Sequence, residues 1–324
     1  MIPIRDNQPT SSLPIATYAL MGTNAVVFFF QLQWGLDNEA VFYLYGLVPG
    51  KYTVWDLSRH FSLSNQIFSM FSYMFFHGGV WHFLGNMWFL YIFGDNIEAH
   101  FGSVRFLGFY LLCGLISGGF HFLLNPVSLV PTIGASGAIA GVMGAYFLLY
   151  PRAKILTLIP IIIIPWLIEI PAFVFLGFWF LMQFLNATGS GAGSGIAWWA
   201  HIGGFVAGVV LVKLNNRLPE TGVRERLNRL TQKKHTPRFQ VIMTQSQDHS
   251  SDLYGQLEVS SLEALTGTKK LVSIPWGFYK PLYRVNVPPG VKKGTRLRLA
   301  GMGKTTPNHE KGDLFLTIQI KNAI

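Results

Sequence analysis

Polar side chains of types that suit acyl transfer lie at three places within otherwise apolar stretches of this chain. Ser136 stands at the start of one apolar run, and His201 lies inside a later one. His82 and Asn86 occupy a third run and are four residues apart, so a helix would place them on one face. A hydroxyl within reach of an imidazole is the pairing of nucleophile and base that acyl transfer requires.

Each of these side chains also has an ordinary structural explanation. A serine at a helix start is a common N-cap, and a histidine in an apolar helix can be a hydrogen-bonded packing residue. An asparagine in such a helix can join two helices. Polar side chains are costly inside a membrane and are functional candidates there, so their combination favours a site.

Two pairs of glycines could bring the serine and the histidine together. Gly137 and Gly141 lie four residues apart, and so do Gly204 and Gly208. Small residues at this spacing let two helices approach closely. If the two helices meet there, the serine hydroxyl would reach the imidazole.

Acyl transfer also needs donors directed at the oxyanion of its tetrahedral intermediate. A helix beginning at Ser136 supplies backbone N–H groups and a positive dipole end, and His82 and Asn86 could add side-chain donors. The apolar run that starts at Ser136 is short. It would therefore begin below the membrane surface and leave a polar cavity for water.

Composition separates a membrane part from a basic part. The chain is 50% hydrophobic and 12% charged, whereas soluble domains carry about a quarter charged residues. Residues 1–212 hold 6 of the 25 Lys and Arg residues and 7 of the 15 Asp and Glu residues, so the remainder is strongly basic. We predict a membrane domain over 1–214, a basic linker over 215–251 with a short helix around Arg224–Leu230, and a third domain over 252–324.

Six apolar runs are long enough, or nearly so, to span a bilayer. The stretch Leu156–Trp166 is also apolar, but two prolines interrupt it, so it is predicted to be interfacial or extended. The first run has no cleavage site of the A-x-A type behind it, so we expect a retained span rather than a signal peptide. The six predicted spans are Ile15–Leu32, Gly78–Phe93, Phe106–Leu124, Ser136–Tyr150, Leu167–Leu185 and Ile196–Leu214.

The distribution of Lys and Arg predicts the orientation of these spans. One side would hold Arg5, Arg105 and the basic linker, whereas the other holds only Lys51 and Arg59 in a long first loop over 33–64. Both termini are therefore expected in the cytoplasm. The first loop would lie on the membrane or pack on the bundle, and a Gly/Ser-rich fifth loop over 186–195 would be a lid or a plain linker.

After Asp252 the sequence alternates with period two, as half-buried strands do. Arg284–Val287, Arg296–Leu299 and Leu314–Ile320 follow this pattern, and Pro288-Pro289-Gly290 marks a turn. A small all-β domain is expected. The fold class is thus an all-α polytopic bundle of six transmembrane helices followed by a β-sandwich-like cytosolic domain.

The three clusters together resemble the signature of the rhomboid intramembrane serine proteases. Gly134-Ala-Ser-Gly137, Ala200-His-x-x-Gly204-x-x-x-Gly208 and His82-x-x-x-Asn86 occur in that family's order over about residues 15–214. The resemblance implies a Ser136–His201 dyad, with His82, Asn86 and the Ser136 backbone as the oxyanion hole. It further implies a structural role for Glu98 and cleavage of membrane proteins within or near their spans.

The sequence departs from that family at two places. An aromatic residue usually lies four positions after the serine, where this chain has Ala140, so Trp198 or Trp199 would have to stack on the histidine. The family's Trp-Arg pair in the first loop is matched only by Trp55 and Arg59.

Residues 252–324 resemble the substrate-binding domain of DnaJ-type co-chaperones in their turn residues, among them Val287-Pro-Pro-Gly-Val-Lys-Lys-Gly and Gly312-Asp-Leu. The resemblance implies a small β-sandwich that could bind extended peptides by strand addition. No His-Pro-Asp helical module and no cysteine-rich zinc module accompany it. The domain would be a docking site for substrate or partner, or only a stable cap.

We expect an enzyme of the membrane, in a bacterial inner membrane because no mitochondrial presequence is seen. The alternative is a catalytically silent client-binding protein, but inactive relatives usually lack the serine or the histidine. A transporter is disfavoured because intramembrane charges are scarce. No cofactor, metal site or nucleic-acid partner is expected, and the single cysteine, Cys113, is predicted to be a packed core residue.

Overall fold

The computed structural model describes residues 1–8, 10, 12–36, 38–161, 164–189, 197–215, 236, 239–245, 251–274, 282–304 and 311–321. Two predictions lie outside this range: most of the Gly/Ser-rich loop and the short helix in the basic linker. The chain divides into two compact units, Met1–Thr231 and Gln232–Ile324.

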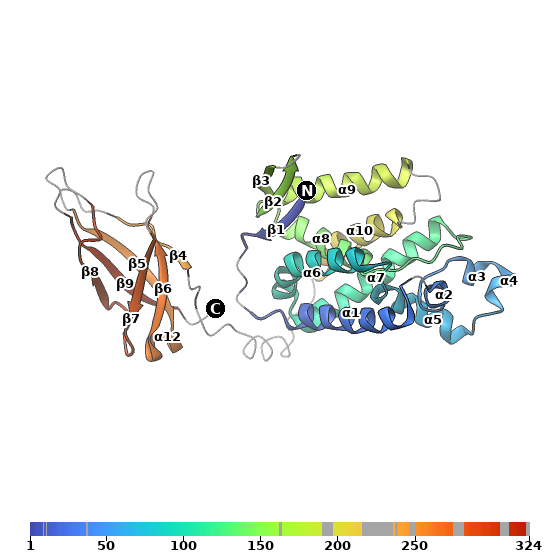
Figure 1. Cartoon of the computed structure of the whole chain (residues 1–324), viewed down its shortest axis with the longest axis horizontal. Helices are drawn as coiled ribbons and strands as arrows, with labels where there is room; N and C mark the ends of the chain where they lie inside the picture. Colours follow the sequence, from blue (N-terminus) through green and yellow to red (C-terminus); the bar gives the residue numbers. More distant parts are fainter. Residues whose placement is uncertain are drawn as a thin grey trace. The chain divides into compact units, whose positions relative to one another are not determined.

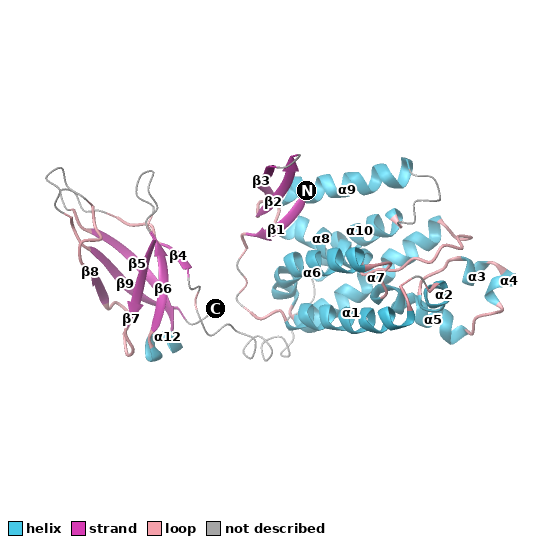
Figure 2. Cartoon of the chain, in the orientation of Figure 1, coloured by secondary structure: helices cyan, strands magenta, loops and turns pink. Residues whose placement is uncertain are grey.

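The first unit is built mainly from helices (Figures 1 and 2). Among the described residues of this unit, four helices are long and apolar enough to cross a membrane: α1, α7, α9 and α10. The sequence predicted six spans; within the described part of the chain, α8 is apolar but shorter, and α6 ends in a polar stretch. The six helices at the predicted spans are α1 (Ile15–Trp34), α6 (Val80–Phe101), α7 (Ser103–Leu124), α8 (Ser136–Leu149), α9 (Ala172–Gly189) and α10 (Trp198–Asn215).

Helix α8 is enclosed by the other helices. All its residues from Gly137 to Tyr146 are buried, and it packs against α6, α7, α9 and α10. A helix that is apolar on every side and contacts protein on every side is a core helix. Its short length therefore leaves Ser136 inside the bundle.

A three-stranded antiparallel sheet interrupts the helical unit, so the prediction of an all-α membrane part was wrong here. Strands β1 (Ile2–Asp6), β2 (Lys154–Ile161) and β3 (Ile164–Pro171) pair in the order β1-β2-β3. The predicted span Leu167–Leu185 consequently starts in β3, and its helix begins only at Ala172. Within the described residues of Leu156–Trp166, the extended alternative of the prediction is confirmed, because β2 runs to Ile161 and β3 begins at Ile164. Prolines and β-branched isoleucines disfavour a helix there.

The N-terminal strand is held against the helices by side chains. The Trp88 indole donates a hydrogen bond to the Pro3 carbonyl at 2.6 Å. The Asp6 carboxylate accepts from the Tyr146 hydroxyl at 2.5 Å and from the Asn96 amide at 2.8 Å. Burial raises the pKa of Asp6 above its ordinary value, and these hydrogen bonds partly oppose that shift.

The segment between α1 and α6 folds into short helices, and α5 among them packs on α7. These elements are α2 (Glu39–Tyr45), α3 (Gly50–Thr53), α4 (Trp55–Ser58), α5 (Leu63–Ser72) and the 3-10 turn η1 (Tyr73–Phe75). Buried Lys51 donates to the Tyr43 carbonyl at 2.8 Å and lies 4.6 Å from the centre of the Phe61 ring. Burial lowers the pKa of Lys51 to about 8. Arg59 pairs with Asp56 at 3.5 Å, whereas Trp55 is exposed.

The second unit contains two three-stranded sheets, ordered β4-β6-β7 and β5-β9-β8. Pairs β4–β6 and β5–β9 are parallel, and β6–β7 and β8–β9 are antiparallel. Alternate residues of both sheets, such as Leu257, Val272 and Leu316, form one buried core. The elements are β4 (Phe239–Val241), β5 (Leu253–Ser260), α12 (Ser261–Thr266), β6 (Thr268–Ser273), β7 (Leu282–Val287), β8 (Arg296–Leu299) and β9 (Leu314–Lys321).

This unit starts earlier than the sequence predicted. The linker was placed over 215–251, but β4 lies within that range, and Ile242 belongs to the buried core. Gln245 also forms a β-bridge with Tyr254. Polar residues surround this short strand in the sequence, so the sequence alone does not indicate it. It is a strand because it pairs with β6.

A buried ion pair ties this early segment to the domain. Glu263 contacts Lys270 at 2.5 Å, and both side chains are almost fully buried. The same carboxylate accepts from the Thr236 hydroxyl at 2.6 Å and from the Ser260 N–H at 2.9 Å. Burial opposes ionisation, but these hydrogen bonds and the lysine prevail and hold the pKa of Glu263 well below its usual range.

Candidate active site

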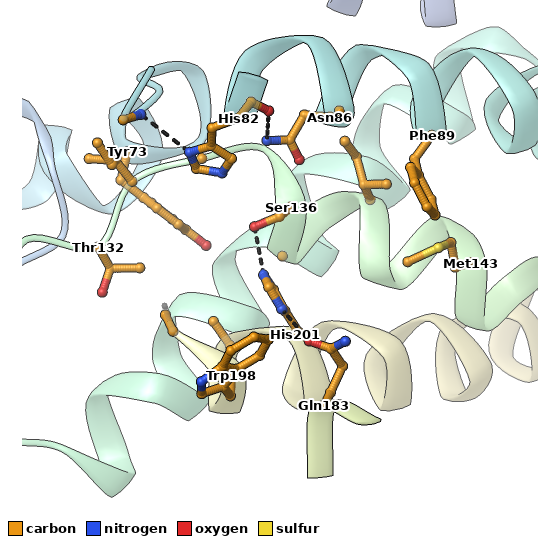
Figure 3. Close-up of a pocket in the computed structure, with 18 of the residues that line it drawn as sticks. Tyr73, His82, Asn86, Phe89, Thr132, Ser136, Met143, Gln183, Trp198 and His201 are labelled. Atoms are coloured by element: carbon orange, nitrogen blue, oxygen red, sulfur yellow. Dashed lines mark hydrogen bonds between the residues drawn. The ribbon is translucent and has the colours of Figure 1, made fainter. Parts of the chain in front are cut away.

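Ser136 and His201 meet in the interior of the first unit. Ser136 is the first residue of α8, and His201 lies in the first turn of α10. The serine Oγ lies 2.8 Å from the imidazole Nε2, and the two side chains point toward each other (Figure 3). The sequence led us to expect this contact between the hydroxyl and the imidazole.

Glycines allow the backbones of α8 and α10 to touch. A Cβ on Gly204 would collide with the Gly137 carbonyl, and one on Gly208 would collide with the Gly141 carbonyl. Ser117 on α7 adds a hydrogen bond of 2.7 Å to the Ala200 carbonyl. The close approach brings the short serine side chain within reach of the imidazole.

The far side of the imidazole contacts α9. His201 Nδ1 lies 2.8 Å from Gln183 Oε1 (Figure 3). The Trp179 ring lies 5.9 Å from the imidazole centre, and the Trp198 ring lies 6.1 Å away in an edge-on arrangement. Trp198 thus approaches the histidine, whereas Trp199 packs on Phe120.

Sequence reasoning missed Gln183 and Trp179. Gln183 is a polar side chain in an apolar run, and the rule that singled out the histidines would have selected it too. Trp179 lies one helical turn before Gln183 and carries no such signal. Only the packing of α9 against α10 identifies it.

His82 and Asn86 project from α6 on the opposite side of the serine. His82 Nδ1 accepts a hydrogen bond from the Gly78 N–H at 3.2 Å, so the neutral imidazole carries its proton on Nε2. Asn86 donates one amide hydrogen to the His82 carbonyl at 2.9 Å, and its second amide hydrogen stays available to a ligand. Both residues line the same cavity as Ser136.

Gly134 makes room beside the serine. Its φ of +125° disfavours any L side chain, and a Cβ there would lie 2.8 Å from the His82 ring. The loop before α8 can therefore pass directly beneath His82. The N–H groups in the first turn of α8 have no acceptor within the helix, and Ser136 and Gly137 of that turn line the same cavity as His82.

These side chains surround a cavity of about 600 Å³. Its wall combines the polar groups above with apolar side chains from α6, α8, α9 and α10, among them Phe89, Met143 and Trp179. A cavity of this kind can hold a peptide segment and water beside a nucleophile.

Two further sets of polar contacts hold α6 and the segment just before it. The Gln31 amide on α1 accepts from the His77 N–H at 3.0 Å and donates to the His77 carbonyl. Glu98 accepts from the N–H groups of Ala16 and Thr17, from the Thr17 hydroxyl and from the Ser103 hydroxyl, all within 2.9 Å. The first contact joins α1 to the segment before α6, and the second joins α6 to α1 and α7.

No group of three or more His, Cys, Asp or Glu side chains in the described part of the chain is arranged to hold a metal ion. Cys113 is buried and contacts the Gly141 position. The chemistry offered by the described residues is that of a serine, two imidazoles and two side-chain amides.

Comparison with known proteins identifies both units. Residues 64–216 match the Rhomboid domain, and residues 253–323 match the DnaJ C terminal domain. The chain is 30% identical over 206 residues to Rhomboid protein 1, mitochondrial, of Saccharomyces cerevisiae, covering 60% of this chain and 51% of the relative. It is 34% identical to Rhomboid protease GluP of Bacillus subtilis, covering 41% of this chain and 23% of that protein.

The second unit has its own relative. It is 29% identical over 75 residues to the DnAJ-like protein slr0093 of Synechocystis, covering 23% of this chain and 21% of the relative. The chain spans about half the length, or less, of the curated relatives it matches. A rhomboid domain with helices able to span a membrane and a β-rich DnaJ C-terminal domain thus occur in one polypeptide. The chain thus combines a segment similar to the Rhomboid domain with one similar to the DnaJ C terminal domain.

Proposed function

We propose that the membrane part of the chain is a serine endopeptidase that hydrolyses peptide bonds within or near the transmembrane segments of other membrane proteins. The observation that carries the proposal is the 2.8 Å contact between Ser136 Oγ and His201 Nε2 at the wall of a cavity. The word protease in the name of the Bacillus subtilis relative agrees with it.

In the acylation step, Ser136 Oγ attacks the carbonyl carbon of the substrate and His201 Nε2 takes the hydroxyl proton. The carbonyl π bond breaks, and its electrons become the oxyanion. Donors for that oxyanion would come from the first turn of α8, the Nε2–H of His82 and the amide of Asn86. The imidazolium then gives its proton to the leaving amine as the peptide C–N bond breaks.

Deacylation repeats these steps with water as the nucleophile. His201 takes a proton from a water molecule in the cavity, and the resulting nucleophile attacks the acyl ester on Ser136. Collapse of the second tetrahedral intermediate releases the new carboxyl terminus and returns the proton to Ser136. The pair works without an acidic third residue and without a cofactor.

We further propose that α1, α6, α7, α8, α9 and α10 all cross the bilayer, with both termini in the cytoplasm. The distribution of Lys and Arg supports this orientation. A bacterial inner membrane remains our proposed location, although three of the relatives are named mitochondrial. The β-rich domain would then lie in the cytoplasm, where it could dock an extended peptide or a partner protein.

Cleavage of a single-span reporter in liposomes tests the proposal. Wild type is expected to cut the reporter within or beside its span, and Ser136→Ala and His201→Ala are each expected to abolish cleavage. Both variants must match wild type in thermal unfolding. If wild type binds the reporter but does not cut it, the silent client-binding alternative replaces the enzyme.

A further inference from the structure

Gln183 contacts the dyad histidine, yet the reaction above gives it no role. Its side chain is 6% exposed and lies on α9, an otherwise apolar helix. Its amide oxygen lies 2.8 Å from His201 Nδ1, on the side of the ring opposite Ser136 (Figure 3). A buried amide in an apolar helix is costly unless its hydrogen bonds are satisfied, so both of its polar atoms need partners.

The second polar atom fixes the direction of the amide. Gln183 Nε2 donates to the Trp179 carbonyl at 3.2 Å, one turn earlier on the same helix. Rotating the amide by half a turn would direct its oxygen at that carbonyl, which places two acceptors face to face. The observed orientation, with the oxygen toward His201, is therefore the one in which both amide groups are paired.

An oxygen at this position determines the tautomer of the imidazole. An amide oxygen can only accept, so His201 Nδ1 must carry the proton in the neutral ring. Nε2 then has a free lone pair directed at Ser136 Oγ, 2.8 Å away, and can act as the base. The opposite tautomer would point an N–H at the serine and leave the nucleophile without a base.

Neighbouring rings restrict the imidazole further. Trp179 and Trp198 lie within 6.1 Å of its centre, and Trp179 is on the same helix as Gln183. At the position where rhomboids usually carry an aromatic residue, this chain has Ala140, whose side chain cannot stack. Helix α9 thus supplies contacts that orient the base.

We propose that Gln183 is a positioning residue for His201, which makes the site a Ser136–His201–Gln183 triad with a neutral third member. This inference rests on the proposed protease function. Gln183 does not touch the substrate carbonyl; it selects the Nδ1–H tautomer and holds the ring in line with Ser136. A residue that only joined α9 to α10 would have no influence on the tautomer.

Nitrogen NMR of histidine-labelled protein tests the tautomer directly in the full chain. The resonances of His201 are assigned by comparison with His201→Gln. Wild type at neutral pH is expected to show a protonated Nδ1 and an unprotonated Nε2. A predominant Nε2–H tautomer in wild type would overturn the inference, whatever the variants do.

Three substitutions on α9 test the consequence for the reaction. Gln183→Leu removes the acceptor at similar volume, Gln183→Glu retains it, and Asn186→Leu is the matched control. Asn186 is also an amide on α9, but it donates to the Met182 carbonyl of its own helix. The readouts are the rate at which a fluorophosphonate labels Ser136, and kcat and KM for a reporter.

Gln183→Leu is expected to lose about tenfold in the labelling rate and in kcat, with KM unchanged, because one hydrogen bond that orients the base is lost. Gln183→Glu should lie closer to wild type, and the acid limb of its pH–rate profile should move to higher pH, since a carboxylate favours the imidazolium. Asn186→Leu should match wild type. The inference is overturned if Gln183→Leu matches Asn186→Leu, or if Gln183→Glu is impaired as strongly as Gln183→Leu.

The proposed function and this inference fail in different ways. Retained cleavage in Ser136→Ala or His201→Ala would overturn the protease itself. Loss of cleavage in those variants, together with a wild-type tautomer and rate in Gln183→Leu, would remove only Gln183 from the site.

Discussion

At the scale of single residues, the site is a row of hydrogen bonds that crosses from α8 through α10 to α9. Ser136 Oγ contacts one nitrogen of His201, and Gln183 Oε1 contacts the other, each at 2.8 Å. On the other side of the serine, His82 and Asn86 present donors to the same cavity. Second hydrogen bonds orient these side chains: Gln183 Nε2 donates to the Trp179 carbonyl, and His82 Nδ1 accepts from the Gly78 N–H.

The Glu98 side chain is buried where α6 meets α1. Its carboxylate accepts four hydrogen bonds, three of them from the first turn of α1. Glu98→Gln places an NH₂ group against these donors, so we expect a loss of about 3 kcal/mol in the free energy of unfolding. Thermal and denaturant unfolding in detergent measures it.

Glu169→Gln is the control for that substitution. Glu169 pairs with Lys154 at 3.0 Å, but both side chains are more than half exposed, so its loss should cost under about 1 kcal/mol. Equal effects of the two substitutions would contradict the structural role of Glu98.

The sequence predicted much of the site because its residues are conspicuous in apolar runs. Ser136, His201, His82 and Asn86 stand out as polar groups where polar groups are costly. Gln31 and Gln183 are also polar groups in apolar runs, but unlike Asn86 they have no histidine or serine at helical spacing beside them. Trp179 could not have been predicted, because one tryptophan among many aromatic residues has no distinguishing feature before α9 is packed on α10.

At the scale of elements, the contact between α8 and α10 controls the distance between Ser136 and His201. Gly204 lies against the Gly137 carbonyl. Gly137 directly follows Ser136, and Gly204 comes three residues after His201. Backbone atoms cannot rotate away from an added methyl group as a side chain can. The two helices would have to separate.

Gly204→Ala is therefore expected to reduce cleavage by at least about tenfold and to destabilise the bundle by about 1–3 kcal/mol, as overpacking typically does. Reporter cleavage and thermal unfolding measure both effects. Gly119→Ala on α7 is the control, because nothing lies within 4 Å of a Cβ at that position. Wild-type cleavage in Gly204→Ala would mean that the close contact does not set the geometry of the site.

Element boundaries were predicted less well where local sequence permits two structures. Ile155–Ile170 is apolar and rich in isoleucine, which suits a strand or the end of a span. Pairing with the distant β1 decides for a hairpin. β4 was assigned to the linker for the same reason: three residues become a strand only when β6 lies beside them.

At the scale of the whole molecule, the chain combines two units with separate cores. The buried residues of the first core end at Val212, and those of the second begin at Ile242. All described groups of the site belong to the first unit. The two units can thus be perturbed separately.

The Glu263–Lys270 pair offers a perturbation of the second unit alone. Lys270→Met leaves a buried carboxylate without its cation, so we expect a loss of about 3–5 kcal/mol in the stability of this unit. Hydrogen exchange of β5 and β6 amides in the full chain measures it. Lys321→Met, which breaks a half-exposed pair with Glu258, should have little effect.

The same pair predicts a dependence on pH. Because the pKa of Glu263 is lowered in the folded state, its contribution is complete above the ordinary value of 4.5 and is lost as the pH falls below it. Amide protection in β5 and β6 should therefore weaken with acidification below about pH 4.5. If Lys270→Met has the same exchange as wild type, this pair does not stabilise the unit.

Removal of residues 217–324 tests the independence of the two units. Since the hydrogen bonds around Ser136 all lie within the first unit, the shortened chain should cleave a generic reporter at a rate within a few-fold of the full chain. Natural substrates that dock on the β-rich domain would instead lose affinity. Abolished cleavage of the generic reporter by a folded truncation would show that the second unit takes part in turnover.

The central claim is that Ser136 is a nucleophile activated by His201, and the most direct measurement is fluorophosphonate labelling located by peptide mass spectrometry. We predict a single adduct on Ser136 in wild type, and no adduct in folded His201→Ala protein. Absence of any adduct in folded wild type, or labelling of Ser136 that persists unchanged in His201→Ala, would contradict the account.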